Sequence, residues 1–191
     1  MYLISISMDE KEYFRKYDGN TPEFTLNGLK TIARVVSIYD ADTVKLVIPV
    51  RGGCFKFNVR LLGIDTCEMK AKNVKNKDLA VKARDRLFEM VTGRVPDPTW
   101  KKKDIEAYLN DDVYVVWVEC EDYDKWGRVL AHIYTSIAED GSGTGSGTGS
   151  GTGSGTGRKS FSQCLIEEKL AYAYQGETKL SEEEQIKYLA P

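Results

Sequence analysis

The sequence predicts an α+β fold with a mainly β core, in which a five-stranded β-barrel is covered by two or three helices. Five short β-rich runs occur in a three-plus-two arrangement, and one amphipathic helical segment separates the third run from the fourth. Five short strands with a helix in this place are typical of an oligonucleotide-binding barrel, the OB-fold. The 191 residues are enough for one such domain with a core of its own.

The first three strands are expected to form an antiparallel meander. They occupy residues 31–39, 43–50 and 54–64, and only short turns rich in Asp or Gly join them. Connections this short allow neighbouring strands to pair as hairpins. Residues 1–27 precede the meander and are expected to form a polar extension with one helical turn at 10–17.

A helix is predicted at 78–91, because apolar residues recur there at helical spacing. These residues are Ala80, Ala83, Leu87 and Met90. Gly93 suits the C-terminal cap, where glycine adopts a left-handed conformation without strain. A lysine-rich loop at 70–77 is expected just before this helix.

Residues 94–112 contain two prolines and three consecutive lysines, and are expected to be a surface insertion with a short helix at 103–109. Strand patterns return at 113–120 and 129–134, which predicts a second hairpin. With these strands and the C-terminal helix described next, we expect the folded domain to span residues 28–175.

The C-terminal part begins with residues 141–157, which consist of four Gly-Ser-Gly-Thr copies and one further glycine. Such a sequence is expected to be a flexible linker. A helix is predicted after it at 161–174. Ser181 followed by Glu184 predicts a capping box, and therefore a terminal helix within the tail 176–191.

Cysteine usage and hydropathy exclude several classes of protein. The four cysteines, which are Cys54, Cys67, Cys120 and Cys164, form no Cys-x-x-Cys pair. A zinc ribbon is therefore excluded, and reduced, mostly buried thiols are expected. There is no apolar run of the length that spans a membrane, and no signal peptide is recognised, so we expect no membrane association and an intracellular protein.

The chain has one histidine, His132, and it lies in a strand-like run that favours a surface or edge-strand position. A single histidine excludes a His-Glu-x-x-His zinc site and makes a Ser-His-Asp triad improbable. Any hydrolysis would therefore depend on carboxylates, arginines and a hard metal ion.

Charge is unevenly distributed along the chain. The net charge is −2, yet residues 51–103 carry 14 Lys and Arg against 6 Asp and Glu. A basic middle segment on an acidic chain favours a polyanionic ligand held at one place, although charge runs are also common on solvated faces.

Three clusters of charged residues coincide with the ends of predicted strands. They are Asp40-Ala41-Asp42-Thr43, the run from Arg60 through Asp65 and Thr66 to Glu68, and Asp124-Lys125-Trp126-Gly127-Arg128. Aspartate at a hairpin turn is common for backbone reasons alone. Phosphodiester hydrolysis, however, needs a metal, a base for water, and cations for the developing charge, and these residue types supply all three.

In their order and spacing, the three clusters resemble the staphylococcal nuclease (thermonuclease) family. The resemblance covers about residues 30–175, apart from 94–112 and the linker. It implies a calcium-dependent nuclease that cleaves DNA or RNA to 3′-phosphate ends. A monomer is the default expectation.

Transferred position by position, the resemblance assigns a role to each charged residue. Asp42, Asp65 and the carbonyl of Thr66 resemble calcium ligands, with Asp40 close to the ion. Glu68 resembles the residue that activates water. Arg60 and Arg128 resemble the arginines that bind the phosphate and stabilise the transition state.

Other positions are less specific. Tyr174 and Tyr172 lie near base-stacking tyrosines of the family, with core packing as the alternative, and Lys70 and Lys72 lie in a loop that contacts nucleic acid in relatives or is simply solvated. Cys67 replaces a family proline; a nucleophilic role for it would lack a histidine partner. A non-catalytic binding module of the same fold is the alternative function, and a plain OB-fold domain that grips single strands by stacking would bind without metal.

Overall fold

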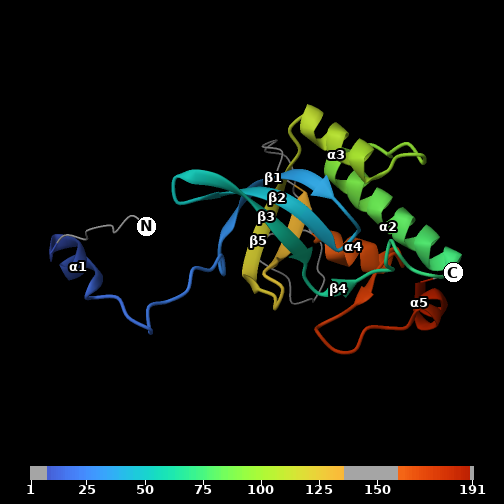
Figure 1. Cartoon of the computed structure of the whole chain (residues 1–191). Coiled ribbons are helices and arrows are strands. Elements are labelled where there is room, and N and C mark those ends of the chain that lie inside the picture. Colours follow the sequence, from blue (N-terminus) through green and yellow to red (C-terminus); the bar gives the residue numbers. More distant parts are fainter. Residues whose placement is uncertain (1–7, 136–158, 190–191) are drawn as a thin grey trace, which may run out of the picture.

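A computed structural model describes residues 8–135 and 159–189, and its centre is a closed five-stranded barrel (Figure 1). The strand order around the barrel is β1-β2-β3-β6-β5. The strands are β1 (Lys30–Ile38), β2 (Thr43–Val50), β3 (Gly53–Leu61), β5 (Val115–Tyr123) and β6 (Val129–Thr135). The predicted α+β barrel, with its meander followed by a hairpin, is confirmed.

The barrel closes where β3 and β6 pair in parallel, with Val59 opposite Val129 and Leu61 opposite Ala131. All other neighbouring strands are antiparallel. Because β6 lies between β3 and β5, His132 is on an interior strand of the sheet, and the edge-strand expectation for it is wrong.

The β2–β3 hairpin is tight because Arg51 and Gly52 both adopt positive φ values, of 40° and 85°. Two such residues give the turn whose twist matches paired strands. The third strand ends at Leu61 rather than at residue 64, since Gly63 (φ 80°) turns the chain. Beyond it, β4 (Ile64–Asp65) leaves the barrel and pairs with β7 (Tyr172–Ala173).

The hydrophobic core fills the barrel and continues under the helices. In β2 every second residue points inward, and Val44, Leu46 and Ile48 are all buried. This period of two is the pattern of a strand with one solvated face. Leu87 and Phe88 from the covering helix join the same cluster.

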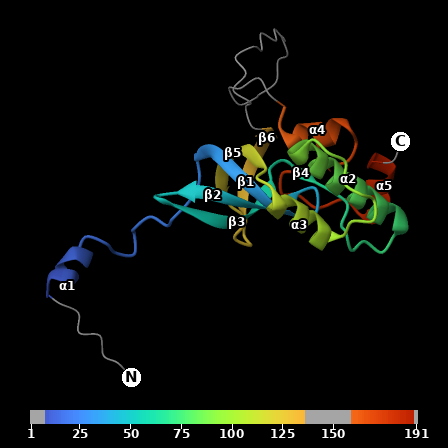
Figure 2. The same ribbon diagram turned by 90° about the horizontal axis from the view of Figure 1, so that it is seen from above.

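Helix α2 (Val74–Thr92) covers one end of the barrel (Figure 2). It begins four residues before the predicted helix, because the Asn73 side chain caps its start by accepting from the Lys75 amide at 2.9 Å. Gly93 forms the predicted left-handed C-cap, with φ 72°. Part of the expected lysine-rich loop is therefore helical.

Helix α3 (Lys102–Asp111) packs against β1, and its Ile105 and Leu109 are completely buried in the main core. Trp100, just before α3, contacts Phe88 with ring centroids 6.0 Å apart. The segment 94–112 is thus part of the folded body, and the expectation of a surface insertion is wrong in this respect. The sequence did not reveal this burial, because only two residues of α3, Ile105 and Leu109, are buried.

Helix α4 (Phe161–Glu167) is shorter than predicted and does not reach residue 174. Lys169 has a positive φ of 55°, and the amides of Leu170 and Ala171 both donate to Leu165 O, which closes the helix. The chain that follows is free to become β7. This early stop places Tyr172 beside Asp65.

Helix α5 (Glu182–Leu189) has the predicted capping box. The Glu184 amide donates to Ser181 Oγ at 3.3 Å, and the Ser181 amide donates to Glu184 Oε2 at 2.8 Å. The Glu182 carboxylate accepts from the amides of Lys72 and Asn73, which fastens α5 to the start of α2.

Helix α1 (Met8–Phe14) stands apart from the barrel at the end of an extended segment (Figure 1). It begins two residues before the predicted turn. The Gly-Ser-Gly-Thr linker at 141–157 lies outside the described residues. Within the described residues, no helix has the length and apolar character needed to cross a membrane.

All four cysteines are free thiols. Cys67 and Cys120 are buried, Cys164 is half-buried and Cys54 is exposed. Of the thiols that were expected to be mostly buried, only two are fully buried.

Candidate functional site

The turn between β1 and β2 brings two aspartates to the end of β3. The Asp42 amide donates to Asp40 Oδ1 at 3.3 Å, and Thr43 Oγ1 donates to Asp42 Oδ1 at 2.7 Å. The Leu61 amide donates to Asp42 O at 2.8 Å. Short aspartate side chains shape such turns by accepting from nearby amides, so the turn that joins the strands also positions Asp42.

Arg60 connects two carboxylates. Its Nη1 lies 2.7 Å from Asp42 Oδ2, and its Nη2 lies 2.8 Å from Asp65 Oδ1. Nη2 also donates to Ile64 O at 3.0 Å. The planar guanidinium suits this bridge because its donors are fixed in a fork. All three charged side chains are buried.

Asp65 lies in β4 and is only 1% exposed. Pairing of β4 with β7 places it opposite Tyr172, whose hydroxyl donates to Asp65 Oδ2 at 2.5 Å. Lys179 Nζ approaches the other oxygen, Oδ1, to 2.8 Å. Asp65 therefore accepts hydrogen bonds from three side chains, which lie in β3, β7 and the segment before α5.

Glu68 is the most exposed carboxylate of the site, with 63% of its side chain accessible. Lys179 Nζ lies 3.2 Å from Glu68 Oε1 and so bridges Glu68 to Asp65. An accessible carboxylate close to buried ones is suitable for contact with a water molecule in the open part of a cleft.

Arg128 is held by the turn between β5 and β6. Asp124 Oδ2 accepts from Arg128 Nε at 2.7 Å, and Asp124 Oδ1 accepts from the Arg128 amide at 2.9 Å. The amide of Trp126 donates to the same oxygen, and Gly127 (φ 77°) closes the turn. Arg128 Nη1 also lies 3.4 Å from Thr43 Oγ1.

These contacts form one continuous path through the five charged residues expected at the site. Arg128 reaches Asp42 through Thr43, Arg60 joins Asp42 to Asp65, and Lys179 joins Asp65 to Glu68. Residues from four separate stretches of the sequence therefore meet at one place, on the same side of the barrel.

A cleft of about 1360 Å³ lies over this path. It is lined by most of the expected residues, which are Asp40, Asp42, Arg60, Glu68, Arg128 and Tyr174. The Arg60 guanidinium lies 5.7 Å from the centroid of the Tyr174 ring, close enough for a cation–π contact. The exposed Trp126 and half-buried His132 complete one wall.

Five expected residues do not line the cleft, among them the buried Asp65. Thr66 is buried, and Tyr172 is buried with its hydroxyl on Asp65, so its ring is not offered to the cleft. Lys70 and Lys72 are exposed but do not line the cleft. For Tyr172, the alternative of packing in the interior matches its position.

Burial and mutual repulsion change the acidity of the aspartates. Burial, followed by the negative charge of Asp42, raises the pKa of Asp40 to about 8. Burial also raises the pKa of Asp42, against the opposing effect of Arg60. Burial works to raise the pKa of Asp65, but hydrogen bonds from its three donors outweigh it and lower that pKa.

The donor chemistry of the site suits a hard cation, because Asp40, Asp42 and Asp65 offer carboxylate oxygens. Asp40, Asp42 and Asp65 are all buried together, a costly arrangement unless positive charge is near. In residues 8–135 and 159–189, however, no three His, Cys, Asp or Glu side chains are grouped to hold a metal ion. Arg60 and Lys179 bond to the oxygens that a cation would need.

Two contributors to the site were not expected from the sequence. Lys179 lies in a segment without a recognisable motif, and it reaches Asp65 from the chain between β7 and α5. Asp124 belongs to the third charged cluster, but the sequence did not reveal that it holds Arg128. Its position four residues before an arginine, across a glycine turn, was the available signal.

A family model described as staphylococcal nuclease homologue matches residues 58–190, more than half of the chain. The matched region contains the end of β3, helices α2 and α3, the β5–β6 hairpin and α5. No curated protein sequence matches the chain.

Proposed function

Because the chain belongs to the staphylococcal nuclease homologue family, we propose that it is a calcium-dependent nuclease that hydrolyses phosphodiester bonds of DNA, RNA or both and leaves 3′-phosphate ends. The observation that carries the proposal is the continuous path of contacts from Arg128 to Glu68 along the floor of one cleft. A binding module that only grips nucleic acid does not require buried acids connected to two arginines.

In this proposal Asp42, Asp65 and the carbonyl oxygen of Thr66 hold calcium, with Asp40 nearby. When bound, calcium supplies charge that anchors and polarises the phosphate. Occupation of the site requires Arg60 and Lys179 to release carboxylate oxygens. Their release would give Arg60 the freedom to turn its donors to a phosphate.

The two arginines have complementary roles at the phosphate. Arg60 and Arg128 both line the cleft and both present planar guanidinium groups. Such groups match pairs of phosphate oxygens and stabilise the charge that develops on them during attack. Arg128 is already oriented by Asp124, whereas Arg60 is held by the two aspartates.

Glu68 is the residue in this set that is open to solvent. We assign it the removal of a proton from the attacking water, and Lys179 the task of keeping its carboxylate near the centre of the site. Because every group comes from a single chain, a monomer suffices for catalysis.

The test is a digestion assay with single-stranded DNA and with RNA, in calcium or in a calcium chelator, at mildly alkaline pH. We expect cleavage in calcium alone, with 3′-phosphate product ends. Arg128→Ala should lower kcat by about 10²–10³, while Arg94→Ala, which removes an exposed arginine away from the cleft, should leave it unchanged. Binding of either nucleic acid without chelator-sensitive cleavage would establish the non-catalytic alternative.

A further inference from the structure

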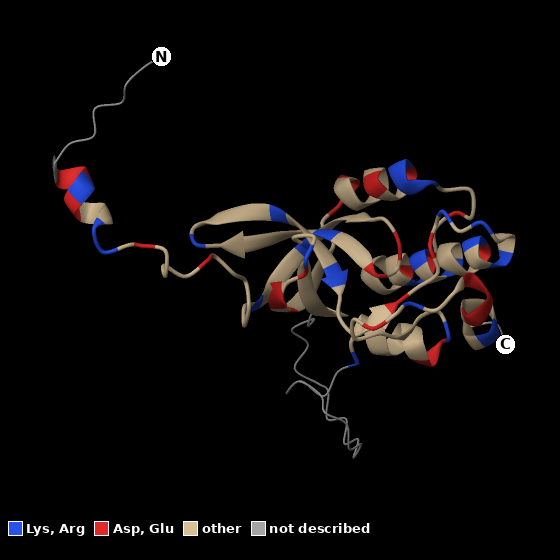
Figure 3. Ribbon diagram, turned by 60° about the horizontal axis from the view of Figure 1, so that its bottom comes forward, with Lys and Arg blue, Asp and Glu red and all other residues tan. Residues whose placement is uncertain are grey.

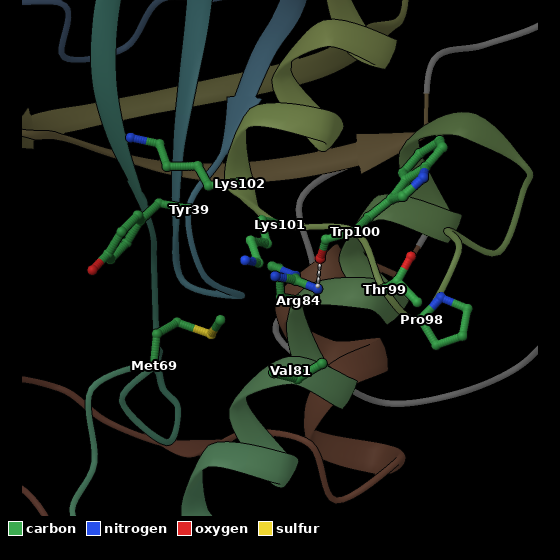
Figure 4. Close-up of a pocket in the computed structure, with 9 residues that line it drawn as sticks. All are labelled: Tyr39, Met69, Val81, Arg84, Pro98, Thr99, Trp100, Lys101 and Lys102. Carbon is green, nitrogen blue, oxygen red and sulfur yellow. Dashed lines mark hydrogen bonds between the residues drawn. The ribbon is translucent and has the colours of Figure 1, made fainter.

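A second pocket, of about 370 Å³, lies between α2 and α3 (Figure 4). Three of its lining side chains are cations, Arg84, Lys101 and Lys102, and none is a carboxylate. Figure 3 shows the positively charged start of α3 on the helical side of the molecule. A small cavity lined by three positive groups has the character of a site for an anion.

Of the three positive charges, that of Arg84 is fixed by the fold and is paired with Asp85. Arg84 is buried in α2, where its Nε and Nη2 bond to Asp85 Oδ1 and its Nη2 lies 3.4 Å from Trp100 O. Figure 4 shows the Lys101 side chain beside the Arg84 guanidinium. In the described part of the chain, Lys101 has no carboxylate within ion-pair distance. Lys102 has only a long pairing with Glu106, at 3.6 Å.

The pocket adjoins the catalytic cleft. Tyr39 lines both, and it directly precedes Asp40 in the turn that carries the acidic residues. Met69, which follows Glu68, forms another wall of the pocket. Lys102 Nζ lies 5.4 Å from the centroid of the Tyr39 ring. A strand that leaves the cleft across Tyr39 therefore arrives directly at the lysines.

We propose that this pocket binds a backbone phosphate of the nucleic-acid strand whose scissile bond lies in the cleft. The proposal rests on the proposed nuclease function and makes polynucleotide chains, rather than very short oligonucleotides, the preferred substrate. Lys101 and Lys102 attract the phosphate, and Arg84 provides a fixed guanidinium beside it. The Tyr39 ring offers a stacking surface to the intervening nucleotide.

The two lysines are not needed for folding. Residues Ile105 and Leu109 anchor α3 in the core, and both lysines are exposed. Lys101 is the N-cap residue of α3, where serine is among the preferred side chains. A double variant Lys101→Ser, Lys102→Gln therefore removes two charges and retains the helix start. A matched control is Lys11→Ser, Lys56→Gln, which removes two exposed lysines from α1 and β3.

The experiment measures binding of labelled single-stranded DNA in a calcium chelator, so that no cleavage is needed. Oligonucleotides of about 4 and about 20 nucleotides bracket the range that an OB barrel covers. For the longer one, the double variant should bind several-fold more weakly. Its plot of log affinity against log salt should be shallower by about 0.7 for each phosphate that the variant no longer neutralises. Binding of the shorter one should not change.

The proposal is overturned if the double variant keeps the affinity and salt slope of the unmodified protein, or if the control variant is weakened as much. Calcium-dependent digestion of the same oligonucleotides separates this failure from that of the nuclease function. If the double variant cleaves both oligonucleotides as well as the original protein does, the second phosphate site is absent but the protein is a nuclease. A protein that neither binds nor cleaves either oligonucleotide refutes both.

Discussion

The ammonium group of Lys179 lies 2.8 Å from Oδ1 of Asp65 and 3.2 Å from Oε1 of Glu68. It thus neutralises a buried carboxylate and orients an exposed one. Burial, which lowers the pKa of Lys179, is outweighed by its bond to Asp65, so that pKa is raised and the group stays charged. A cation of the protein itself therefore lies at the oxygen that is proposed to bind calcium.

Lys179→Met should increase calcium affinity by about 1.4- to fivefold, because a half-exposed ion pair worth about 0.2–1 kcal/mol no longer has to be broken. Isothermal titration calorimetry with calcium alone measures this without any activity assay. The control is Lys187→Met, which replaces an exposed lysine of α5 that does not line the cleft. Weaker calcium binding in Lys179→Met would show that the lysine supports the site instead of competing with the ion.

Arg60→Ala and Arg128→Ala should separate stability from catalysis. Both should lower kcat by about 10²–10³. Arg60→Ala should also lower the free energy of unfolding by about 3 kcal/mol, since it leaves Asp42 and Asp65 buried without their shared partner. Arg128 pairs with Asp124 at a more accessible position, so its removal should cost about 1 kcal/mol or less. Urea unfolding in chelator measures the loss of stability, and steady-state rates in calcium measure the loss of activity. Equal decreases in stability for the two variants would contradict the description of Arg60 as a buried bridge.

Gly63→Ala should destabilise the protein by about 1–2 kcal/mol, because residue 63 has a φ of 80°, where a Cβ is strained. Apart from residue 63 and its two chain neighbours, no described residue has an atom within 4 Å of the added methyl group, so the cost comes from the backbone alone. Gly19→Ala is the control, since its φ lies outside the left-handed region and its surroundings are equally open. Thermal unfolding distinguishes the two; no shift for Gly63→Ala would mean that the turn into β4 tolerates a different conformation.

The cysteines should differ in reactivity. Burial raises the pKa of Cys120 to about 11 and also raises that of Cys67. A thiol whose pKa is raised stays protonated below that pKa, so at mildly alkaline pH neither should react in the folded protein. Cys54 is exposed and should be alkylated first. Mass spectrometry after brief treatment with iodoacetamide identifies the modified site, and early modification of Cys120 would show that the barrel opens at that point.

Local sequence patterns predicted much of the fold. The alternating run in β2, the glycine turn before β3, and the Ser181–Glu184 pair are all decided by neighbouring residues. Each of these features has a short-range physical cause, namely strand alternation, positive φ or reciprocal capping. For that reason the sequence alone was sufficient for them.

Two of the errors have long-range causes. Helix α4 was predicted to reach residue 174, but the strand pairing of Tyr172 with Asp65 competes successfully with a weak helical pattern. The burial of Ile105 and Leu109 depends on α3 packing against β1, which no local pattern specifies.

By itself, the sequence determined the barrel, the turn chemistry and the acidic and basic residues of the three clusters. Tertiary structure decided how those residues are connected, since Arg60 meets Asp42 only through strand pairing and Lys179 reaches Asp65 from the chain between β7 and α5. The physical reason is that a side chain's charge and hydrogen-bonding capacity belong to its residue type. Which partner it finds depends on contacts between segments far apart in the chain.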